Sequence, residues 1–221
     1  MHTTSAKELN KIPLGSADVY LMKYTGTIPK DSEIEKDENM IGRVKNGVSI
    51  SYTTESYKAK SDDGKAVKTK IVSEDAYAEW SYITWNGRTL KVLLATATMD
   101  GTTSSGKRTV KIGGLQYDDG VSYVLRLVHT DRITGDIRIT MVGKNVAGWM
   151  AAFKPNQETL VNAKFEAEPL DQNGTLIVYE EEILEEDTAV AALASKAGGF
   201  PAYSPEASET ADSEDPSDFS I

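Results

Sequence analysis

Alternating apolar and polar residues run through much of this chain and predict a mainly β protein. The clearest alternation lies in residues 161–170. One face of this predicted strand carries Val161, Ala163, Phe165 and Ala167. The other face carries Asn162, Lys164, Glu166 and Glu168. Further strands are predicted at 17–24, 47–52, 77–85, 108–114, 121–130, 136–144, 149–153 and 175–182. Short strands separated by turn residues indicate an antiparallel β-sandwich or barrel.

One segment departs from the two-residue alternation. In residues 89–97, Leu90, Leu93 and Leu94 have the i, i+3, i+4 spacing of one helix face. Thr89 is a suitable N-cap residue. We therefore expect one short helix flanking the strands, with a strand over the same residues as the alternative.

Residues 53–76 form a long, mostly polar stretch centred on Asp63-Gly64. An Asp-Gly pair between two extended stretches predicts a tight hairpin turn. We therefore expect an extended hairpin that has no hydrophobic core of its own. Asn173-Gly174 predicts a second hairpin turn, and residues 25–39, with Gly, Pro and several acids, predict a loop.

The net charge of −10 is unevenly distributed along the 221 residues. Residues 185–221 contain nine acids and one lysine, a net charge of −8, which leaves −2 for residues 1–184. We divide the chain into an N-terminal arm (1–16), a β domain (17–184) and an acidic C-terminal extension (185–221). This distribution argues against a protein that grips DNA, because phosphate contacts require a basic face.

Composition excludes several further classes. The chain has no cysteine, which rules out disulfide scaffolds, thiolate metal sites and cysteine nucleophiles. It contains no run of about 18 apolar residues, so we expect no membrane-spanning helix and no membrane partner. The N-terminal residues lack the apolar stretch of a signal peptide.

Residues 101–109 (GTTSSGKRT) come close to a phosphate-binding loop. Gly101, Gly106 and Lys107 fit its pattern, but Arg108 stands where a Ser or Thr hydroxyl is needed. A phosphate-binding loop also leads into a helix, whereas β-branched residues follow here. We interpret the segment as a Gly/Ser/Thr-rich loop.

Other candidate chemistry is weak. His129 cannot form a histidine-rich metal site alone, and the acidic run 180–187 lacks the EF-hand spacing. Trp80, Trp85 and Trp149 are candidates for a sugar-binding platform, although burial is the favoured interpretation. We find no catalytic constellation and therefore expect no enzyme activity, no cofactor and no metal.

Longer stretches are more informative than these short motifs. Residues 12–29 (IPLGSADVYLMKYTGTIP) and 135–182 (GDIRITMVGKNVAGWMAAFKPNQETLVNAKFEAEPLDQNGTLIVYEEE) closely resemble major tail tube proteins of long-tailed bacteriophages and of related phage-like particles of Gram-positive hosts. Residues 84–90 (TWNGRTL) and 108–114 (RTVKIGG) resemble the same family. The resemblance covers most of residues 10–183 and does not include the acidic extension.

This resemblance implies a β-sandwich with one flanking helix, six copies of which form a ring. The inner strands of the six copies would join into one β-barrel, and stacked rings would form a hollow tube. The implied partners are other copies of the chain, a tape-measure protein and genomic DNA in the lumen, tail terminator and tail tip proteins and, in a contractile tail, a sheath. The implied location is the virion, after assembly in the host cytoplasm.

Two surfaces are candidates for contacts in such a tube. The hairpin at 53–76 is assigned to ring stacking, with Tyr57, Lys58, Asp62, Asp63 and Lys65 as candidate contacts. The polar stripe Asn162, Lys164, Glu166 and Glu168 faces either the bore or the outside of the tube. A near-neutral or acidic bore would let DNA slide, whereas clustered Lys and Arg would retain it. The N-terminal arm and the acidic extension are further assembly candidates, because segments that order on binding need not be ordered alone.

Two other functions stay open. The chain could be a β-sandwich binding module on a virion or cell surface that holds a glycan or a protein through its loops and tryptophans. The third hypothesis is an enzyme that uses residues 101–109.

Overall fold

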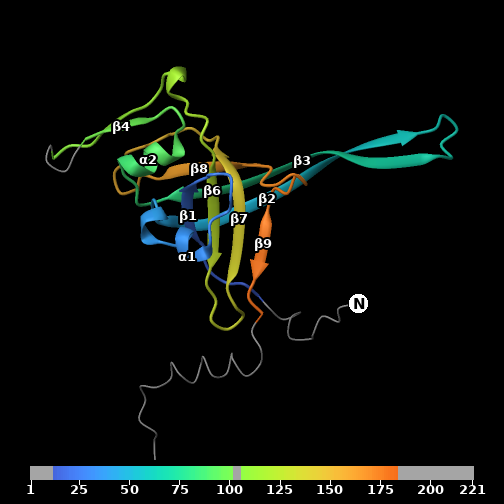
Figure 1. The fold of residues 1–221 in the computed structure, drawn as a ribbon, viewed down its shortest axis with the longest axis horizontal. Coiled ribbons are helices and arrows are strands. Elements are labelled where there is room, and N and C mark those ends of the chain that lie inside the picture. Colours follow the sequence, from blue (N-terminus) through green and yellow to red (C-terminus); the bar gives the residue numbers. More distant parts are fainter. Residues whose placement is uncertain (1–11, 102–105, 184–221) are drawn as a thin grey trace, which may run out of the picture. The chain divides into compact units, whose positions relative to one another are not determined.

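Nine β-strands account for most of the regular structure in the residues that the computed structural model describes, which are 12–101 and 106–183 (Figure 1). The strands are β1 (Asp18–Lys23), β2 (Val44–Lys60), β3 (Val67–Tyr82), β4 (Thr98–Asp100), β5 (Thr109–Lys111), β6 (Tyr123–His129), β7 (Ile137–Asn145), β8 (Val161–Glu168) and β9 (Val178–Glu181). The helical elements of these residues are the α-helices α1 (Asp31–Ile34) and α2 (Gly87–Leu93) and the 3₁₀ helices η2 (Asp37–Asn39) and η4 (Leu115–Tyr117).

Seven strands form one antiparallel sheet in the order β1-β6-β7-β8-β3-β2, with β9 also paired to β7. β8 pairs with one end of β7 and β9 pairs with the other end, so β8 and β9 follow one another along the same edge. β4 and β5 form a separate two-stranded sheet. The predicted mainly β, antiparallel fold with a flanking helix is confirmed, and the hexameric ring stays a prediction.

The main core lies on one face of this sheet. Val19 and Leu21 of β1 belong to the same buried cluster as Trp80 and Tyr82 of β3, although three strands separate β1 from β3. The sheet must therefore curl around its own apolar face. Figure 1 shows this curvature, because β2 and β3 cross β6 and β7 at a steep angle. Along β8, the predicted alternation holds, since Val161, Ala163 and Phe165 are all buried.

Helix α2 covers part of this core through Leu90 and Leu93, and Leu94 is buried just beyond it. The helix begins two residues earlier than predicted, and Thr89 is not its N-cap. Asn86 is the N-cap, because its side chain accepts a hydrogen bond from the Arg88 N–H at 2.8 Å. Thr89 instead completes a capping box, in which its hydroxyl accepts from the Asn86 N–H at 3.1 Å.

The opposite face of the sheet carries a smaller buried cluster. Ile34 of α1 packs there against Val124 of β6 and Val142 of β7. Residues 25–39 were expected to form only a loop, but they contain α1 and η2. The physical reason is that Ile34 can be buried on the sheet when residues 31–34 form a helical turn.

Two further predictions are wrong. Residues 149–153 form no strand; Trp149, Met150 and Phe153 remain exposed. The turn at Asn173-Gly174 does form, closed by the Leu170 N–H to Thr175 carbonyl hydrogen bond of 2.9 Å. It does not produce a hairpin, however, because β9 pairs with β7 and not with β8.

Candidate functional site

A strip of polar side chains lies on the sheet face opposite the main core. It consists of Tyr77, Glu79 and Ser81 from β3 and Asn162, Lys164, Glu166 and Glu168 from β8. We call this surface the polar strip. The two strands bring it together because residues paired across an antiparallel ladder point to the same face. The four residues predicted from β8 therefore do share one surface, and β3 supplies partners that the single-strand pattern could not identify.

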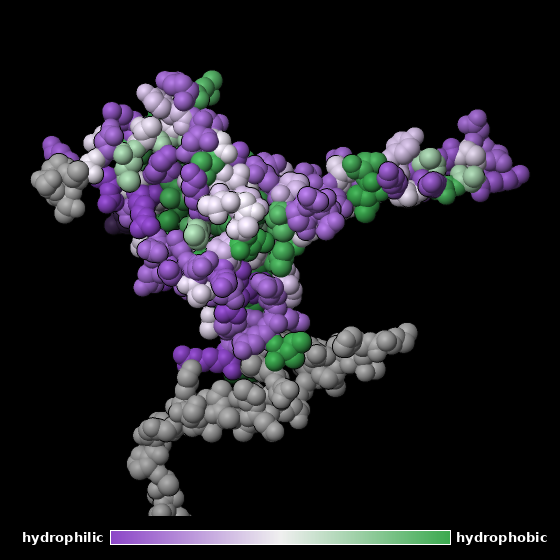
Figure 2. Space-filling view, in the orientation of Figure 1, coloured by the Kyte–Doolittle hydropathy of each residue, from purple (hydrophilic) through white to green (hydrophobic). Residues whose placement is uncertain are grey.

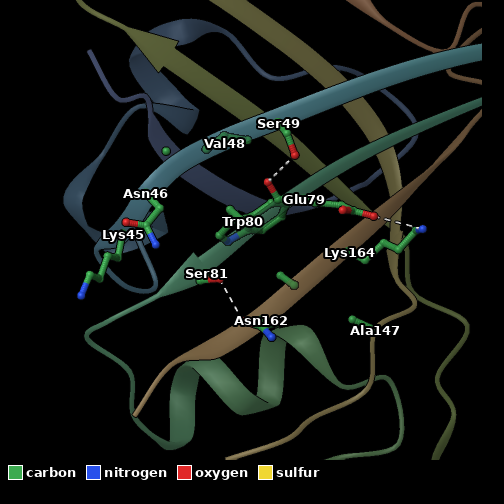
Figure 3. A pocket seen from close by; sticks show the side chains of 12 residues that line it. Lys45, Asn46, Val48, Ser49, Glu79, Trp80, Ser81, Ala147, Asn162 and Lys164 are labelled. Atoms are coloured by element: carbon green, nitrogen blue, oxygen red, sulfur yellow. Dashed lines mark hydrogen bonds and ion pairs between the residues drawn. The ribbon is translucent and has the colours of Figure 1, made fainter. Parts of the chain in front are cut away.

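Each pair across the strip makes a polar contact. The Ser81 hydroxyl donates to Asn162 Oδ1 at 2.8 Å, and Lys164 Nζ lies 3.0 Å from Glu79 Oε1 (Figure 3). The Tyr77 hydroxyl donates to Glu166 Oε1 at 3.3 Å. The strip is thus a connected ladder of side chains and not a set of independent surface groups.

The strip contains three carboxylates and one lysine, and that lysine is held within it. The hydrogen bond to Glu79 is the main reason that the pKa of Lys164 is raised above its ordinary value. Lys164 Nζ also lies 4.5 Å from the centre of the Tyr77 ring. At the end of β8, Glu168 lies 3.5 Å from Lys144 Nζ and accepts a hydrogen bond from the Ser122 hydroxyl. The lysines of this surface are therefore already engaged by carboxylates.

An open depression lies where the strip meets β2 (Figure 3). The backbone of β2 bulges there at Asn46 and Gly47, both with positive φ. The ionisable side chains in its lining are Lys45, Glu79 and Lys164, and Glu79 is held by Lys164. This lining provides no nucleophile paired with a general base, so it does not resemble a catalytic cleft.

The β2–β3 hairpin extends well beyond the body of the domain (Figure 1). Its last buried residue is Ala76, and both strands are exposed from there to the turn except for the partly covered Ser73. Apolar side chains are exposed on it among hydrophilic ones (Figure 2), including Tyr57 at 65% and Val72 at 59% exposure. The hairpin predicted at 53–76 is thus formed, and it belongs to strands longer than predicted.

The predicted stacking residues lie on the outer part of this hairpin. Tyr57 and Lys58 are on β2, and Asp62, Asp63 and Lys65 are at the turn; all five are exposed. Asp63 Oδ1 accepts hydrogen bonds from the Ser61 hydroxyl at 2.5 Å and from the Lys65 N–H at 3.1 Å. These bonds, that of Ser61 first, lower the pKa of Asp63. Asp63 therefore shapes the turn, and any contact role of the five residues stays a prediction.

Two of the three tryptophans named as a candidate sugar-binding platform lie in a partly exposed aromatic cluster, which we call the exposed aromatic cluster. Trp85 lies 6.4 Å from Trp149 and 6.5 Å from Phe153, measured between ring centres. The Trp85 indole N–H donates to the Thr159 carbonyl at 3.0 Å. Trp80 is buried as expected, whereas Trp149 is 44% exposed, so the expectation of burial is wrong for that tryptophan.

A buried charge network was also missed. Arg126 of β6 is only 3% exposed and lies 2.7 Å from Asp31, 3.4 Å from Glu35 and 3.6 Å from Glu180. Arg138 of β7 lies 2.9 Å from the same Glu35. The sequence signal for this network was a single arginine within the apolar stretch of residues 123–128. An arginine in a buried strand indicates nearby carboxylates, because a buried charge requires partners.

The near phosphate-binding segment and His129 show no arrangement of a binding or catalytic site among the described residues. The near phosphate-binding segment connects β4 to β5, and a strand follows Lys107 and Arg108 where a phosphate site would need a helix. Residues 102–105 of this segment lie outside the described part. His129 Nδ1 lies 3.0 Å from the Ser16 carbonyl. Within 12–101 and 106–183 there is no cluster of three potential metal ligands and no helix that could cross a membrane.

Comparison with known proteins finds weak likenesses to solved structures, including two from gene transfer agent particles. No protein-family model matches the chain, and no curated protein is similar to it in sequence. A chain from the tail of an empty GTA particle, refined with C6 symmetry, shares 10% identity at a TM-score of 0.38 over 74% of this chain and 96% of that chain. A chain from the virion of a native gene transfer agent particle shares 12% identity at a TM-score of 0.33 over 74% and 95% of the two chains. Likenesses at these scores carry no argument about function.

Proposed function

We propose that this protein is a structural virion protein, the subunit of a phage tail tube, and that it acts by self-assembly and not by catalysis. In this proposal six copies form a ring and the rings stack into a hollow tube. The proposal draws on the sequence resemblance over residues 10–183 and on the surfaces described above.

The observation that carries the proposal is the β2–β3 hairpin. Eight residue pairs of the ladder extend past the last buried position, from Thr53–Asp75 to Lys60–Val67. At about 3.3 Å per residue they give a projection of about 26 Å. An isolated two-stranded ribbon is marginally stable in water. A ribbon of this length that exposes Tyr57, Val67, Ile71 and Val72 is expected to gain its stability by packing on another molecule.

The sheet edges support ring formation. β1 and β2 are the outermost strands of the main sheet, and among the described residues each has one edge without a paired strand. Unpaired edges promote aggregation unless they are covered. A heterologous contact that closes into a ring would pair such edges, and contacts between rings would stay open-ended and give a filament.

The polar strip is our candidate for the wall of the bore. Lys164 of the strip and the adjacent Lys144 are held by carboxylates, so the strip offers few free cations to phosphate groups. The proposed partners are a tape-measure protein and DNA in the lumen, terminator and tip proteins at the tube ends and, in a contractile tail, a sheath. The proposed location is the virion, with assembly in the host cytoplasm. The N-terminal arm (1–16) and the acidic extension (185–221) are further assembly segments in this proposal.

Electron microscopy of the purified full-length chain tests the proposal directly. We expect rings or hollow tubes at high protein concentration. A variant in which an Asn-Gly turn replaces residues 56–71 should keep the thermal unfolding midpoint of the parent domain but form no stacked tubes. Monomers under all conditions, for the parent chain as well, would contradict the tube.

The exposed aromatic cluster favours a second candidate, the binding module. Trp149 and Phe153 present ring surface to solvent, and such rings can stack on sugars or on a protein partner. Glycan-array binding that is lost in Trp149→Ala, by a chain that does not self-assemble, would support this alternative over the tube.

A further inference from the structure

The β2–β3 hairpin is electrically polarised along its length. Its outer half, residues 56–71, contains five lysines and two aspartates and so carries a net charge of +3. Its inner half, residues 47–55 and 72–80, contains Glu55, Glu74, Asp75 and Glu79 and no basic residue. One ribbon therefore presents a positive end and a negative base.

Most of these charges are not neutralised within the molecule. Four lysines of the outer half are exposed and form no ion pair among the described residues: Lys58, Lys60, Lys68 and Lys70. Lys65 lies 3.8 Å from Asp63 in the turn. In the inner half, the carboxylates of Glu55 and Asp75 are exposed and also lack an ion-pair partner within the described ranges. The two ends of the ribbon cannot satisfy each other, because the strands hold them apart.

Exposed apolar side chains lie among the unpaired lysines. Tyr57 and Lys70 are directly opposite each other across the ladder, and Val67 and Ile71 flank the same lysine region. A solvated charged face would not need these residues. Apolar residues surrounded by charge are typical of a surface that another protein covers.

We propose that the outer half of the hairpin of one copy docks on the inner half of the hairpin of a second copy, with lysines opposite carboxylates. This inference rests on the proposed tube and identifies the surface that receives the hairpin. Two hairpins side by side in register would place like charges opposite each other, which disfavours association. A stagger by about half the hairpin length places opposite charges together, and repeated in one direction it generates an open-ended stack.

The charge pattern favours this occupant over a nucleic acid. A polyanion drawn to the lysines would be repelled by the carboxylates at the base of the same ribbon, and the whole chain carries −10. A second hairpin presents both signs in the required order. Association should therefore weaken as salt increases, because screening shortens the range of exposed charges from about 10 Å at 0.1 M to about 3 Å at 1 M.

Charge exchange in the full-length chain tests the inference. The first variant reverses two charges of the outer half (Lys68→Glu with Lys70→Glu), the second reverses two charges of the inner half (Glu55→Lys with Asp75→Lys), and the third combines all four changes. The control, Lys23→Glu with Lys154→Glu, makes the same change in net charge as the first variant at exposed lysines elsewhere. All six substitutions are at exposed positions, and thermal unfolding verifies that each variant folds. The readout is the critical concentration for assembly, measured by sedimentation and light scattering.

We expect each two-site reversal to raise the critical concentration at least about tenfold, because the reversed side chains then face like charges on the second hairpin. In the four-site variant, whose net charge equals that of the parent, the exchanged residues again face opposite charges, so its critical concentration should fall back toward the parent value. The control should not differ from the parent. An inner-half reversal that assembles like the parent overturns the inference and leaves the tube intact. In that case, loss of assembly on removing residues 185–221 would identify the acidic extension as the occupant, and retention of duplex DNA by the outer-half lysines would identify a nucleic acid. Absence of any association in the parent chain overturns both proposals.

Discussion

Arg126 is the residue whose surroundings most depend on distant parts of the chain. It lies in the buried run of β6, and its partners Asp31, Glu35 and Glu180 come from the α1 region and from β9. Placing a guanidinium in the interior is costly unless several hydrogen bonds and carboxylates compensate it. The network therefore joins α1, β6, β7 and β9 at one point, and Glu35 is central because it contacts both Arg126 and Arg138.

The substitution Glu35→Gln tests the importance of this network. It keeps the shape of the side chain but removes the charge that two partly or fully buried arginines share. We expect the free energy of unfolding to fall by about 3 kcal/mol, at the lower end for a broken buried ion pair because Glu35 retains some exposure. Urea denaturation measures the change. The control Glu38→Gln removes an exposed carboxylate 4.0 Å from Lys36 and should cost less than about 0.5 kcal/mol; equal costs for the two variants would contradict the network.

The hydrogen bonds of Asp131 predict how the stability of the fold depends on pH in the acid range. Its carboxylate accepts hydrogen bonds from the Thr134 hydroxyl at 2.7 Å and from the Ile133 N–H at 2.8 Å, and these bonds lower its pKa below the ordinary value. Because the pKa is lower in the folded state, the ionised carboxylate stabilises the fold above the unfolded-state pKa. This stabilisation is lost as the pH falls through the folded-state pKa.

Asp131→Asn should therefore reduce the dependence of stability on pH in the acid range. Between about pH 5 and pH 2 the free energy of unfolding should decrease less in this variant than in the parent chain. Urea denaturation at a series of pH values provides the measurement. Asp62→Asn, at a carboxylate that accepts no hydrogen bond within the described ranges, serves as the control and should retain the pH dependence of the parent; identical curves for all three proteins would rule out the role given to Asp131.

Among the elements, α2 is stabilised at its start by a local arrangement. Asn86 accepts from Arg88, Thr89 accepts from Asn86, and the Thr89 hydroxyl donates to the carbonyl of Ile41, which anchors the helix to a distant segment. Substitution of an N-cap Asn by Ala typically costs about 1 kcal/mol. We expect Asn86→Ala to lower the free energy of unfolding by about this amount, as measured by thermal or urea denaturation. Asn86→Asp, which preserves the acceptor, should remain within a few tenths of the parent; a loss as large as that of Ala would mean that capping is not the role of Asn86.

The elements also show which features a sequence pattern can identify. β8 was predictable because Val161, Ala163 and Phe165 alternate with polar residues and are buried, which is a local property of a half-buried strand. The pairing of β9 with β7 was not predictable from the sequence. The Asn-Gly pair specifies only a turn, whereas the strand that β9 pairs with depends on the packing of the whole sheet. Residues 149–153 were assigned to a strand, yet four of the five are exposed. The partners of Arg126 could not be identified either, since Asp31 is 95 residues away along the chain.

For the whole molecule, the open question is which surface faces the bore of the proposed tube. The polar strip was predicted from β8 as either the lumen wall or an outer face. In the structure its lysine, Lys164, is held by Glu79, and the adjacent Lys144 is held by Glu168, so a passing DNA would meet paired lysines and an excess of carboxylates. A wall with free cations would form contacts with successive phosphates, and each such contact adds to a salt-dependent attraction.

Adding lysines to the polar strip tests whether it lines the lumen or lies on the outer face of the tube. In Asn162→Lys with Glu166→Lys, every copy along the tube would present new positive charge to the lumen, and we expect DNA release from purified particles to slow while tube assembly is unchanged. The slowing should be relieved at higher salt, because the contacts displace counterions. The control, Gln116→Lys with Asp37→Lys, makes the same change in net charge at exposed positions outside the strip and should release DNA at the parent rate. Dye fluorescence of the released DNA follows the kinetics. If the strip variant releases DNA as fast as the parent at every salt concentration, the strip lies on the outside of the tube, and another face of the sheet must line the path of the genome.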